Sequence, residues 1–494
     1  MSLTYVCAFL NLHEDRSNDK SVETCFKHFQ RLASSGIKLH AFISEEYIEH
    51  YKHLIPDKPH IHIEPISLYD LTTYKELQGL SYELPPIRTG HHDTANFMIL
   101  MNAKIEFVQR AIDAAVFGTT HYAWIDFSIC HVLKNWNSSC KYLQCISSSA
   151  LQDRCLVFPG CWSKGTATHD LFNKINWRFC GGFFLGDRTS LTEMYTLYRT
   201  HFTEIIKNSG VLAWETNLWQ YLALYHNWNP QWFSANHDDS ILRIPFRYFK
   251  TAASLTTIPS RVDHECRKTL DSLIGQVDKI YISIADVYKR FGEYNELPAF
   301  FQEEPYKSAV QVVRGTDFGP ATKYLGALAE IPDNSWIFFC DDDQEYAQGL
   351  IERMAHVIDT VAVYQNHYSS ILQKTSGGII HGYVGNFIHK SLLGRLATFP
   401  LPEPAYFVDD QWMSIYCYLN HIDIHATNIE SYCDIFKVLD NHHEKWGSNS
   451  LSGLKNRDEK VREVCEFFKV RFCHDEGIPY VLTQKLKSLG CSRV

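Results

Sequence analysis

Two stretches of the chain open with the same alternation of apolar strands and amphipathic helices. The apolar run from Tyr5 to Leu10 predicts a buried strand, and helical spacing of apolar residues follows from Val22 to Ala33. A second start of this kind comes at the middle of the chain, where the run from Ala252 to Ile258 leads into a helical pattern that ends at Leu273. A β-rich run over Lys279 to Ile284 comes next. A chain that restarts a β-α-β pattern at its midpoint is best divided there.

We therefore predict two α/β domains in tandem, over residues 1–249 and 250–494. Each half has the usual size of a single nucleotide-binding domain, and in each we expect a Rossmann-like, mostly parallel sheet. No Gly/Ser-rich or Pro-rich linker separates the halves, so we expect the two domains to pack directly on one another.

Composition and charge narrow the class of protein. The chain is 45% hydrophobic and 21% charged, as globular proteins are, and its net charge is −9 without any run of Lys or Arg. Nucleic acid is therefore not an expected partner. An acidic protein that binds a nucleotide must neutralise it locally, and a divalent cation held by carboxylates does so.

Targeting signals are not evident in the sequence. The opening apolar run lacks a basic start, and no apolar run reaches the roughly 18 residues that a membrane-spanning helix needs. The 15 cysteines show no C-x-x-C pair or zinc-type spacing, which favours reduced thiols. We expect a cytoplasmic protein without a transmembrane segment; its oligomeric state is open.

The strongest chemical signal lies in the second half. The apolar run from Trp336 to Cys340 predicts a strand buried on both faces, and three aspartates, Asp341, Asp342 and Asp343, follow it directly. In extended geometry Asp341 and Asp343 face the same way and can converge on one cation while Asp342 points elsewhere. Carboxylates at the carboxyl end of a strand suit Mg²⁺ or Mn²⁺ bound to a nucleotide diphosphate. The alternative is an acidic turn that caps a helix over Gln348 to Ile358.

A second carboxylate pair, Asp409 and Asp410, opens an apolar helical stretch. One of the two is a candidate general base that accepts the proton of an attacking acceptor hydroxyl, and the alternative is helix capping. A glycine-rich segment from Ser376 to Gly385 would let backbone approach an acceptor sugar closely, although a simple turn explains it almost as well. His442 and His443 are candidates for a late metal ligand, or ordinary surface histidines.

The ordered motifs of the second half resemble those of the GT-A-fold, family-2-like glycosyltransferases that contain a D-x-D motif. These motifs are Thr256–Arg261, Asp317–Lys323, Asp341–Asp343 and Val408–Ser414. The resemblance implies that Asp341 and Asp343 hold the metal and that the base is Asp409 or Asp410, as in inverting enzymes. It also implies donor contacts from Thr257, Arg261, Asp317, Lys323 and Asp342. On their own, Lys323 could be a surface lysine and Arg261 a loop cap.

The first half contains a weaker version of the same pattern. The strand candidate Tyr122 to Ile125 ends in Asp126, and an upstream motif, Arg88 to Thr94, precedes a long helical pattern that contains Lys104. Downstream lie Arg178–Asp187 and Trp214–Trp219. This ordered set resembles the HtrL/YibB (WlaTC-like) family, whose members are expected to be glycosyltransferases.

The resemblance implies a metal near Asp126 and an acceptor near Glu215, which would be the catalytic group. It also implies donor contacts from Asp93 or Lys104. Ser128 stands where a D-x-D pair would have its second carboxylate, which departs from the metal-binding pattern. His237 is a candidate imidazole ligand for the metal. The alternatives are a turn-capping role for Asp126, a helix-terminal charge for Glu215 and a structural role for His237.

Together these features predict a bifunctional glycosyltransferase that transfers sugars from UDP- or GDP-sugar donors to an oligosaccharide acceptor, with Mn²⁺ or Mg²⁺ in at least the second domain. Two other classes stay open. The first domain could be a non-catalytic carbohydrate-binding module, or the triple aspartate could serve a metal-dependent phosphohydrolase or nucleotidyltransferase.

Overall fold

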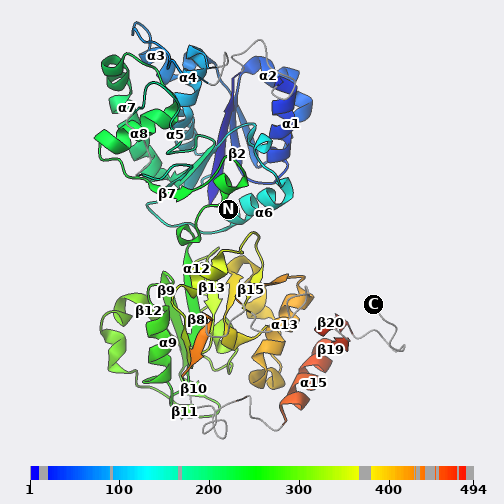
Figure 1. The fold of residues 1–494 in the computed structure, drawn as a ribbon. Coiled ribbons are helices and arrows are strands. Elements are labelled where there is room, and N and C mark those ends of the chain that lie inside the picture. The colour runs from blue at the N-terminus through cyan, green and yellow to red at the C-terminus, as the bar shows by residue number, and fades with distance from the viewer. Residues whose placement is uncertain are drawn as a thin grey trace. The chain divides into compact units, whose positions relative to one another are not determined.

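The computed structural model describes residues 2–10, 21–88, 93–164, 170–366, 380–427, 429, 434–439, 451, 456–475 and 478–484. The chain divides into two compact units, Met1–Tyr248 and Phe249–Val494. Each unit has one seven-stranded sheet with helices on its faces (Figure 1). The predicted α/β class with two mostly parallel sheets is confirmed.

The sheet of the first unit has the order β3-β2-β1-β4-β6-β5-β7. All neighbours are parallel except at β6, which runs antiparallel to both β4 and β5. The strands are β1 (Leu3–Phe9), β2 (Leu39–Ile43), β3 (Ile61–Pro65), β4 (His121–Ile125), β5 (Leu156–Gly160), β6 (Phe183–Asp187) and β7 (Gln231–Ser234). The central strands β1, β2 and β4 are buried along nearly their whole length, and β1 and β4 lie at the apolar runs from which strands were predicted.

Local signals begin and end the helices of the first unit. The Ser21 hydroxyl accepts the Thr24 amide at the start of α1, and Asp187 accepts two amides at the start of α7. The helical pattern around Lys104 forms two helices rather than the one predicted, because the helix is interrupted at Ala103. The helices are α1 (Val22–Ala33), α2 (Glu45–His50), α3 (Thr72–Glu76), α4 (Ala95–Asn102), α5 (Lys104–Ala114), α6 (Trp136–Ser148), α7 (Arg188–Ser209) and α8 (Glu215–Tyr225).

The sheet of the second unit has the order β12-β9-β8-β13-β16-β15-β17. Its strands are β8 (Thr251–Thr256), β9 (Lys279–Ala285), β12 (Val310–Gly315), β13 (Trp336–Phe339), β15 (Val363–Gln365), β16 (Asn386–His389) and β17 (Ile424–Ala426). Only β16 among them is antiparallel to its neighbours. When the strands of each large sheet are numbered along the chain, both sheets read 3-2-1-4-6-5-7, with strand 6 reversed. The two units therefore share one topology.

Shorter elements complete the second unit. Its helices are α9 (Glu265–Leu273), α10 (Tyr306–Ala309), α11 (Thr322–Leu325), α12 (Leu350–Ala355), α13 (Asp409–Leu419) and α15 (Arg457–Phe468). Three two-stranded sheets pair β10 (Val287–Tyr288) with β11 (Gly292–Glu293), β14 (Gln344–Tyr346) with β18 (Phe436–Val438), and β19 (Val470–Asp475) with β20 (Ile478–Gln484). A core that includes Trp412 and Tyr324 packs α13 and α11 against β13.

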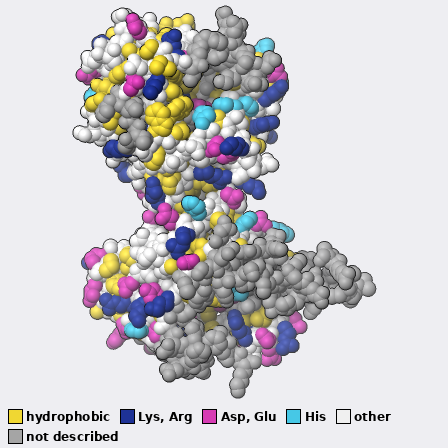
Figure 2. Space-filling model, in the orientation of Figure 1, with side chains coloured by type: hydrophobic (Ala, Val, Ile, Leu, Met, Phe, Trp, Pro, Cys, Tyr) yellow, Lys and Arg dark blue, Asp and Glu magenta, His cyan; other side chains and the backbone are white. Residues whose placement is uncertain are grey.

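Two surface properties bear on partners. Among the helices that the structure describes, none has both the length and the apolar character that a bilayer span requires. On the face drawn in Figure 2, Lys and Arg side chains are interspersed with Asp and Glu on both units.

Candidate functional site

The acidic run of the second unit lies just beyond the carboxyl end of β13, where α/β sheets bind their ligands. The chain leaves extended geometry there, because Asp342 and Asp343 form a turn. The predicted alternation of their side chains is therefore wrong. Asp341 contacts Lys323, while Asp342 and Asp343 both contact Arg261. Helix α12 has Gly349 at its N-cap without a side-chain cap, so the aspartates do not cap it.

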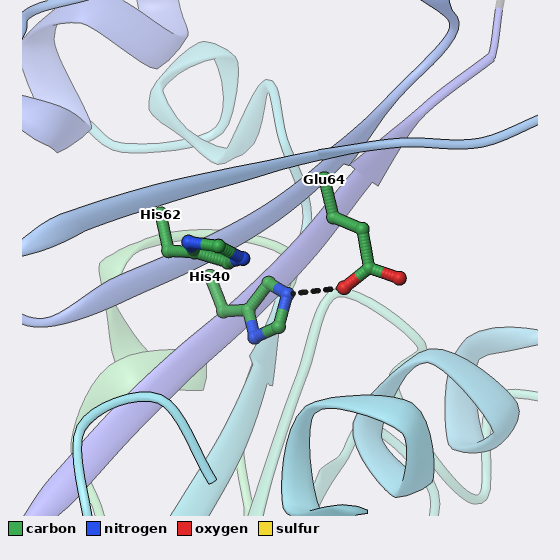
Figure 3. Close-up of side chains that lie close together, drawn as sticks. All are labelled: His40, His62 and Glu64. Carbon is green, nitrogen blue, oxygen red and sulfur yellow. Dashed lines mark hydrogen bonds and ion pairs between the residues drawn. The ribbon is translucent and has the colours of Figure 1, made fainter. Parts of the chain in front are cut away.

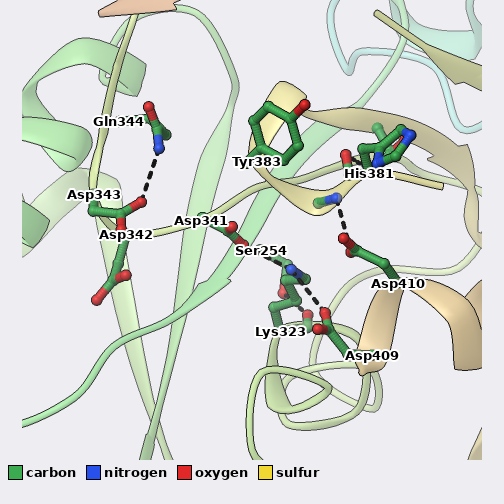
Figure 4. A network of polar contacts seen from close by, with 12 residues as sticks. Ser254, Lys323, Asp341, Asp342, Asp343, Gln344, His381, Tyr383, Asp409 and Asp410 are labelled. Atoms are coloured by element: carbon green, nitrogen blue, oxygen red, sulfur yellow. Dashed lines mark hydrogen bonds and ion pairs between the residues drawn. The ribbon is translucent and has the colours of Figure 1, made fainter. Parts of the chain in front are cut away.

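Lys323 is the centre of a buried charge cluster in the second unit (Figure 4). Its Nζ lies 2.6 Å from Oδ1 of Asp341 and 2.9 Å from Oδ2 of Asp409, and its side chain is 2% exposed. Burial lowers the pKa of the Lys323 ammonium, but the carboxylates of Asp341 and Asp409 outweigh burial and place the pKa well above its usual value. Lys323 is thus a buried cation between two carboxylates and not a surface lysine.

Asp410 has an environment unlike that of Asp409. The backbone N–H of Gly382 donates to Oδ1 of Asp410 over 2.9 Å (Figure 4). Burial and the neighbouring Asp409 raise the pKa of Asp410 to about 7, against the opposing effect of Lys323. Neither aspartate caps α13, whose N-cap is Val408. Of the pair, Asp410 has the pKa that suits a proton acceptor near neutral pH.

A second cluster of the same unit forms around Arg261. Its Nη1 lies 2.9 Å from Oδ1 of Asp342 and 3.0 Å from Oδ2 of Asp343, and the Thr257 hydroxyl donates to Oδ2 of Asp342 over 2.6 Å. Burial raises the pKa of Asp343 to about 7, with Arg261 opposing and Asp342 and Asp341 adding to the rise. Burial is thus the main cause of the raised pKa of Asp343, and a bound cation would oppose it by favouring the ionised carboxylate.

Asp317 links two segments that carry site residues. Its carboxylate accepts the backbone N–H groups of Lys289 and Gly319 and the hydroxyl of Tyr406, over 2.8, 2.7 and 2.7 Å. These bonds tie the loop before α11 to the 3-10 helix Glu403–Phe407, which leads into α13. In this structure Asp317 thus positions the segments of Lys323 and Asp409; its predicted contact with the donor stays a prediction.

The first unit contains a cluster with the same chemistry. Nζ of Lys104 lies 3.2 Å from Oδ1 of Asp126 and 2.8 Å from Oε1 of Glu215, and it donates to the carbonyl of Gly181 over 2.9 Å. The indole N–H of Trp124 also donates to Asp126. Burial lowers the pKa of Lys104, but Asp126 and Glu215 outweigh it and the pKa is raised. Burial raises the pKa of Glu215 against the opposing effect of Lys104.

The two clusters occupy corresponding places in the shared topology. In each unit the lysine lies in the first turn of a helix between strands 3 and 4, and an aspartate follows strand 4. The second carboxylate, Glu215 or Asp409, is the first residue of a helix between strands 6 and 7. A glycine just before strand 6, Gly181 or Gly382, lies against the lysine. Because these residues come from separate loops, the correspondence is visible only once the sheets are folded.

The two glycines offer a direct test of these clusters. A Cβ at position 382 would lie 2.2 Å from Nζ of Lys323, and one at position 181 would lie 2.1 Å from Oε1 of Glu215. We expect Gly382→Ala and Gly181→Ala each to displace an ion pair and to lower the free energy of unfolding by about 1–3 kcal/mol, measured by denaturant unfolding. Gly315→Ala is the matched control, because a Cβ there meets open space. Equal stability of all three variants would show that both clusters accommodate an added methyl group without losing an ion pair.

The remaining predicted residues of the first unit are Asp93, His237 and Ser128, which stands where a second carboxylate was expected. Oγ of Ser128 lies 2.8 Å from Nδ1 of His28, so a neutral hydroxyl occupies the place that Asp343 has in the second unit. Asp93 is buried one residue before Thr94, the N-cap of α4. His237 is exposed, with its ring centroid 5.8 Å from that of Trp177.

Two further points concern metal ligands. Within the described ranges, one group of three potential ligands lies within 4.8 Å, and it consists of His40, His62 and Glu64 rather than any predicted ligand. Thr89–His92, Ser376–Ile379, His442 and His443 lie outside the described residues, so the structure does not bear on them.

Comparison with known sequences identifies one family. Residues 83–251 match the family HtrL_YibB, described as bacterial protein of unknown function. The resemblance of the first half to this family is confirmed over those residues. No curated protein matches the chain.

Comparison with solved structures finds distant likenesses. The chain is similar to glucosyl-3-phosphoglycerate synthase from Mycobacterium tuberculosis in complex with Mn²⁺, uridine-diphosphate and phosphoglyceric acid, with 12% identity over 48% of this chain and 90% of that chain, at a TM-score of 0.29. It is also similar to the catalytic domain of Drosophila β1,4galactosyltransferase 7 in complex with xylobiose, with 11% identity over 49% of this chain and 95% of that chain, at a TM-score of 0.27. Likenesses of this degree do not identify an activity.

Proposed function

We propose that the chain is a bifunctional glycosyltransferase in which each unit transfers a sugar from a nucleotide-sugar donor to a glycan acceptor. One observation carries the proposal: a buried lysine between two carboxylates occurs twice, at corresponding strand ends of two sheets with the same topology. The carboxyl ends of the strands are where α/β sheets bind nucleotides. Burying charged groups costs desolvation free energy, so the presence of the same buried cluster in both units favours a role for it beyond folding.

In the second unit the donor site would be metal-dependent. Asp341 and Asp343 would hold Mn²⁺ or Mg²⁺ once their carboxylates turn from Lys323 and Arg261 toward one ion, because both provide hard oxygen ligands and their side chains are 34% and 17% exposed. When bound, the ion would neutralise the diphosphate of a UDP- or GDP-sugar and stabilise it as a leaving group. Arg261 and Thr257 both donate hydrogen bonds to Asp342, next to the proposed metal ligands. Thr257, Arg261 and Asp342 are therefore the proposed donor-binding residues of this site.

The reaction in the second unit needs a proton acceptor. Asp410, whose pKa is raised to about 7, would accept the proton of the acceptor hydroxyl as that oxygen attacks the anomeric carbon. A single displacement of this kind inverts the configuration of the anomeric carbon. Lys323 would hold the carboxylates of Asp341 and Asp409 in place while the donor enters.

In the first unit Glu215 is the proposed catalytic carboxylate, with Lys104 on the donor side and Asp126 nearest the metal. Lys104 and Glu215 are 3% and 5% exposed, whereas the Asp126 side chain is 35% exposed and accessible to a ligand. Ser128 supplies no second carboxylate, so the first unit has the weaker case for a metal.

Donor-dependent thermal stabilisation tests the proposal. UDP- and GDP-sugars would be screened with Mn²⁺ or Mg²⁺ on the full chain, and at a donor concentration of about 100 Kd we expect roughly 2.7 kcal/mol of stabilisation. Asp343→Asn should lose the metal-dependent part. Asp333→Asn should retain it, because that side chain is 88% exposed and pairs with Lys390, outside both proposed sites.

Other outcomes would overturn parts of the proposal. No response to any nucleotide-sugar with either metal would reject the donor class, and an undiminished response in Asp343→Asn would reject the metal site. Glu215→Gln with unchanged transfer would indicate that the first unit is a non-catalytic carbohydrate-binding module.

A further inference from the structure

His40, His62 and Glu64 lie together on one face of the first unit's sheet (Figure 3). His40 is on β2, and His62 and Glu64 are on the neighbouring parallel strand β3, which is at the edge of the sheet. The register places His40 beside His62, and Glu64 lies two residues further along β3. Because side chains alternate along a strand, the register itself brings all three to the same face.

The three side chains are close enough to share one ion. One ligand atom from each lies within 4.8 Å of the others, and Nε2 of His40 is 3.0 Å from Oε2 of Glu64. The rings of His40 and His62 have centroids 4.6 Å apart and are nearly perpendicular, at 88°. Ligands at about 2.0–2.2 Å from a tetrahedral ion are separated by little more than 3 Å, so small side-chain rotations would complete such a site.

Burial differs among the three residues in a way that suits a bound ion. His40 is 1% exposed and its ring stacks on Phe42, with centroids 4.6 Å apart, so its position is fixed. His62 and Glu64 are half-buried on the edge strand, which leaves a path for an ion and room for a fourth ligand such as water. The cluster is thus anchored on one side and open on the other.

The ligand types select a class of metal. Mg²⁺ and Ca²⁺ prefer all-oxygen sites, whereas two imidazoles and one carboxylate suit Zn²⁺ and its neighbours among the transition metals. A hydrogen bond between His40 and Glu64 would by itself satisfy the buried imidazole. That bond does not account for His62, the third potential ligand that the register brings beside them.

We propose that His40, His62 and Glu64 bind a divalent cation of the zinc class, which ties edge strand β3 to β2. The site is separate from the proposed nucleotide-sugar sites and does not depend on them, because none of its ligands belongs to either lysine cluster.

Zinc and cobalt binding to the full chain would test this site. After dialysis against a chelator, we expect Zn²⁺ to raise the midpoint of thermal unfolding and Co²⁺ to produce the visible absorption of a tetrahedral nitrogen- and oxygen-ligated ion. His62→Gln and Glu64→Gln should lose both responses and still fold, because both side chains lie on the half-exposed edge strand.

Two controls separate this site from other binding. His53→Gln removes an exposed histidine of the same unit, and Asp343→Asn removes a ligand of the proposed donor site, so both should keep the zinc response. Wild-type protein without zinc-dependent stabilisation or cobalt absorption would overturn the proposal. So would His62→Gln and Glu64→Gln variants that respond as the wild type does.

Discussion

Lys323→Met is expected to reduce sugar transfer by the second unit on the order of 10²–10³-fold while the first unit continues to transfer. The substitution removes the nitrogen that lies 2.6 Å from Asp341 and 2.9 Å from Asp409. Asp341, 34% exposed, and Asp409, 12% exposed, are then left without the cation that lies between them, which is electrostatically unfavourable. The free energy of unfolding of the second unit should fall by about 2–4 kcal/mol, which is less than for a fully buried pair because solvent screens the partly exposed Asp341.

Release of nucleoside diphosphate and denaturant unfolding would measure these two effects. Lys104→Met is the matched control, because Lys104 pairs with Asp126 and Glu215 in the same way and its loss should affect only the first unit. A Lys323→Met protein that unfolds and transfers as the wild type does would contradict the role of this cation in the site. If Lys323→Met disables both units equally, the units do not act as separate transferases.

Much of the fold follows from short-range patterns in the sequence. The helix from Val22 to Ala33 has a serine cap and an apolar face, and the structure places α1 over the same residues. The strand runs ending at Cys340 and Ile284 were also predictable, the first from a continuous apolar run and the second from its β-branched and aromatic residues. The break at Ala103 was not predicted, since alanine favours helix and nothing in the local sequence stops one there.

The site was less predictable because its contacts are long-range. Asp341 could be predicted from its position after an apolar strand and Asp409 from its position at the start of an apolar helix. Their shared contact with Lys323 depends on three loops that meet at one sheet edge. The direction of Asp343 was predicted from strand geometry, and a turn changed it. His40, His62 and Glu64 were missed, since strand register cannot be read from single residues separated by a helix and loops.

Asp410→Asn is expected to reduce transfer by the second unit by about 10²–10⁴-fold and to remove its dependence on pH near neutrality. The pKa of Asp410 is raised to about 7, so the carboxyl is mostly protonated at pH 6 and mostly ionised at pH 8. Only the ionised form accepts a proton, so kcat/KM of the wild type should rise from pH 6 and level off above about 7. The measurement would use saturating Mn²⁺, because Asp343 also has a pKa raised to about 7 and a bound ion would keep it ionised.

Stability should change with pH in the opposite direction, which provides an independent test of the same residue. Because the pKa of Asp410 is higher in the folded chain than in the unfolded chain, the folded state holds the proton more tightly, and its stability falls as pH rises toward about 7. Asp410→Asn removes this ionisation, so its stability relative to the wild type should increase from about pH 4 to about pH 7 and stay constant above that. Asp409→Asn should keep a rising rate profile, since Asp410 remains. If Asp410→Asn retains the wild-type pH profile of kcat/KM, another group accepts the proton.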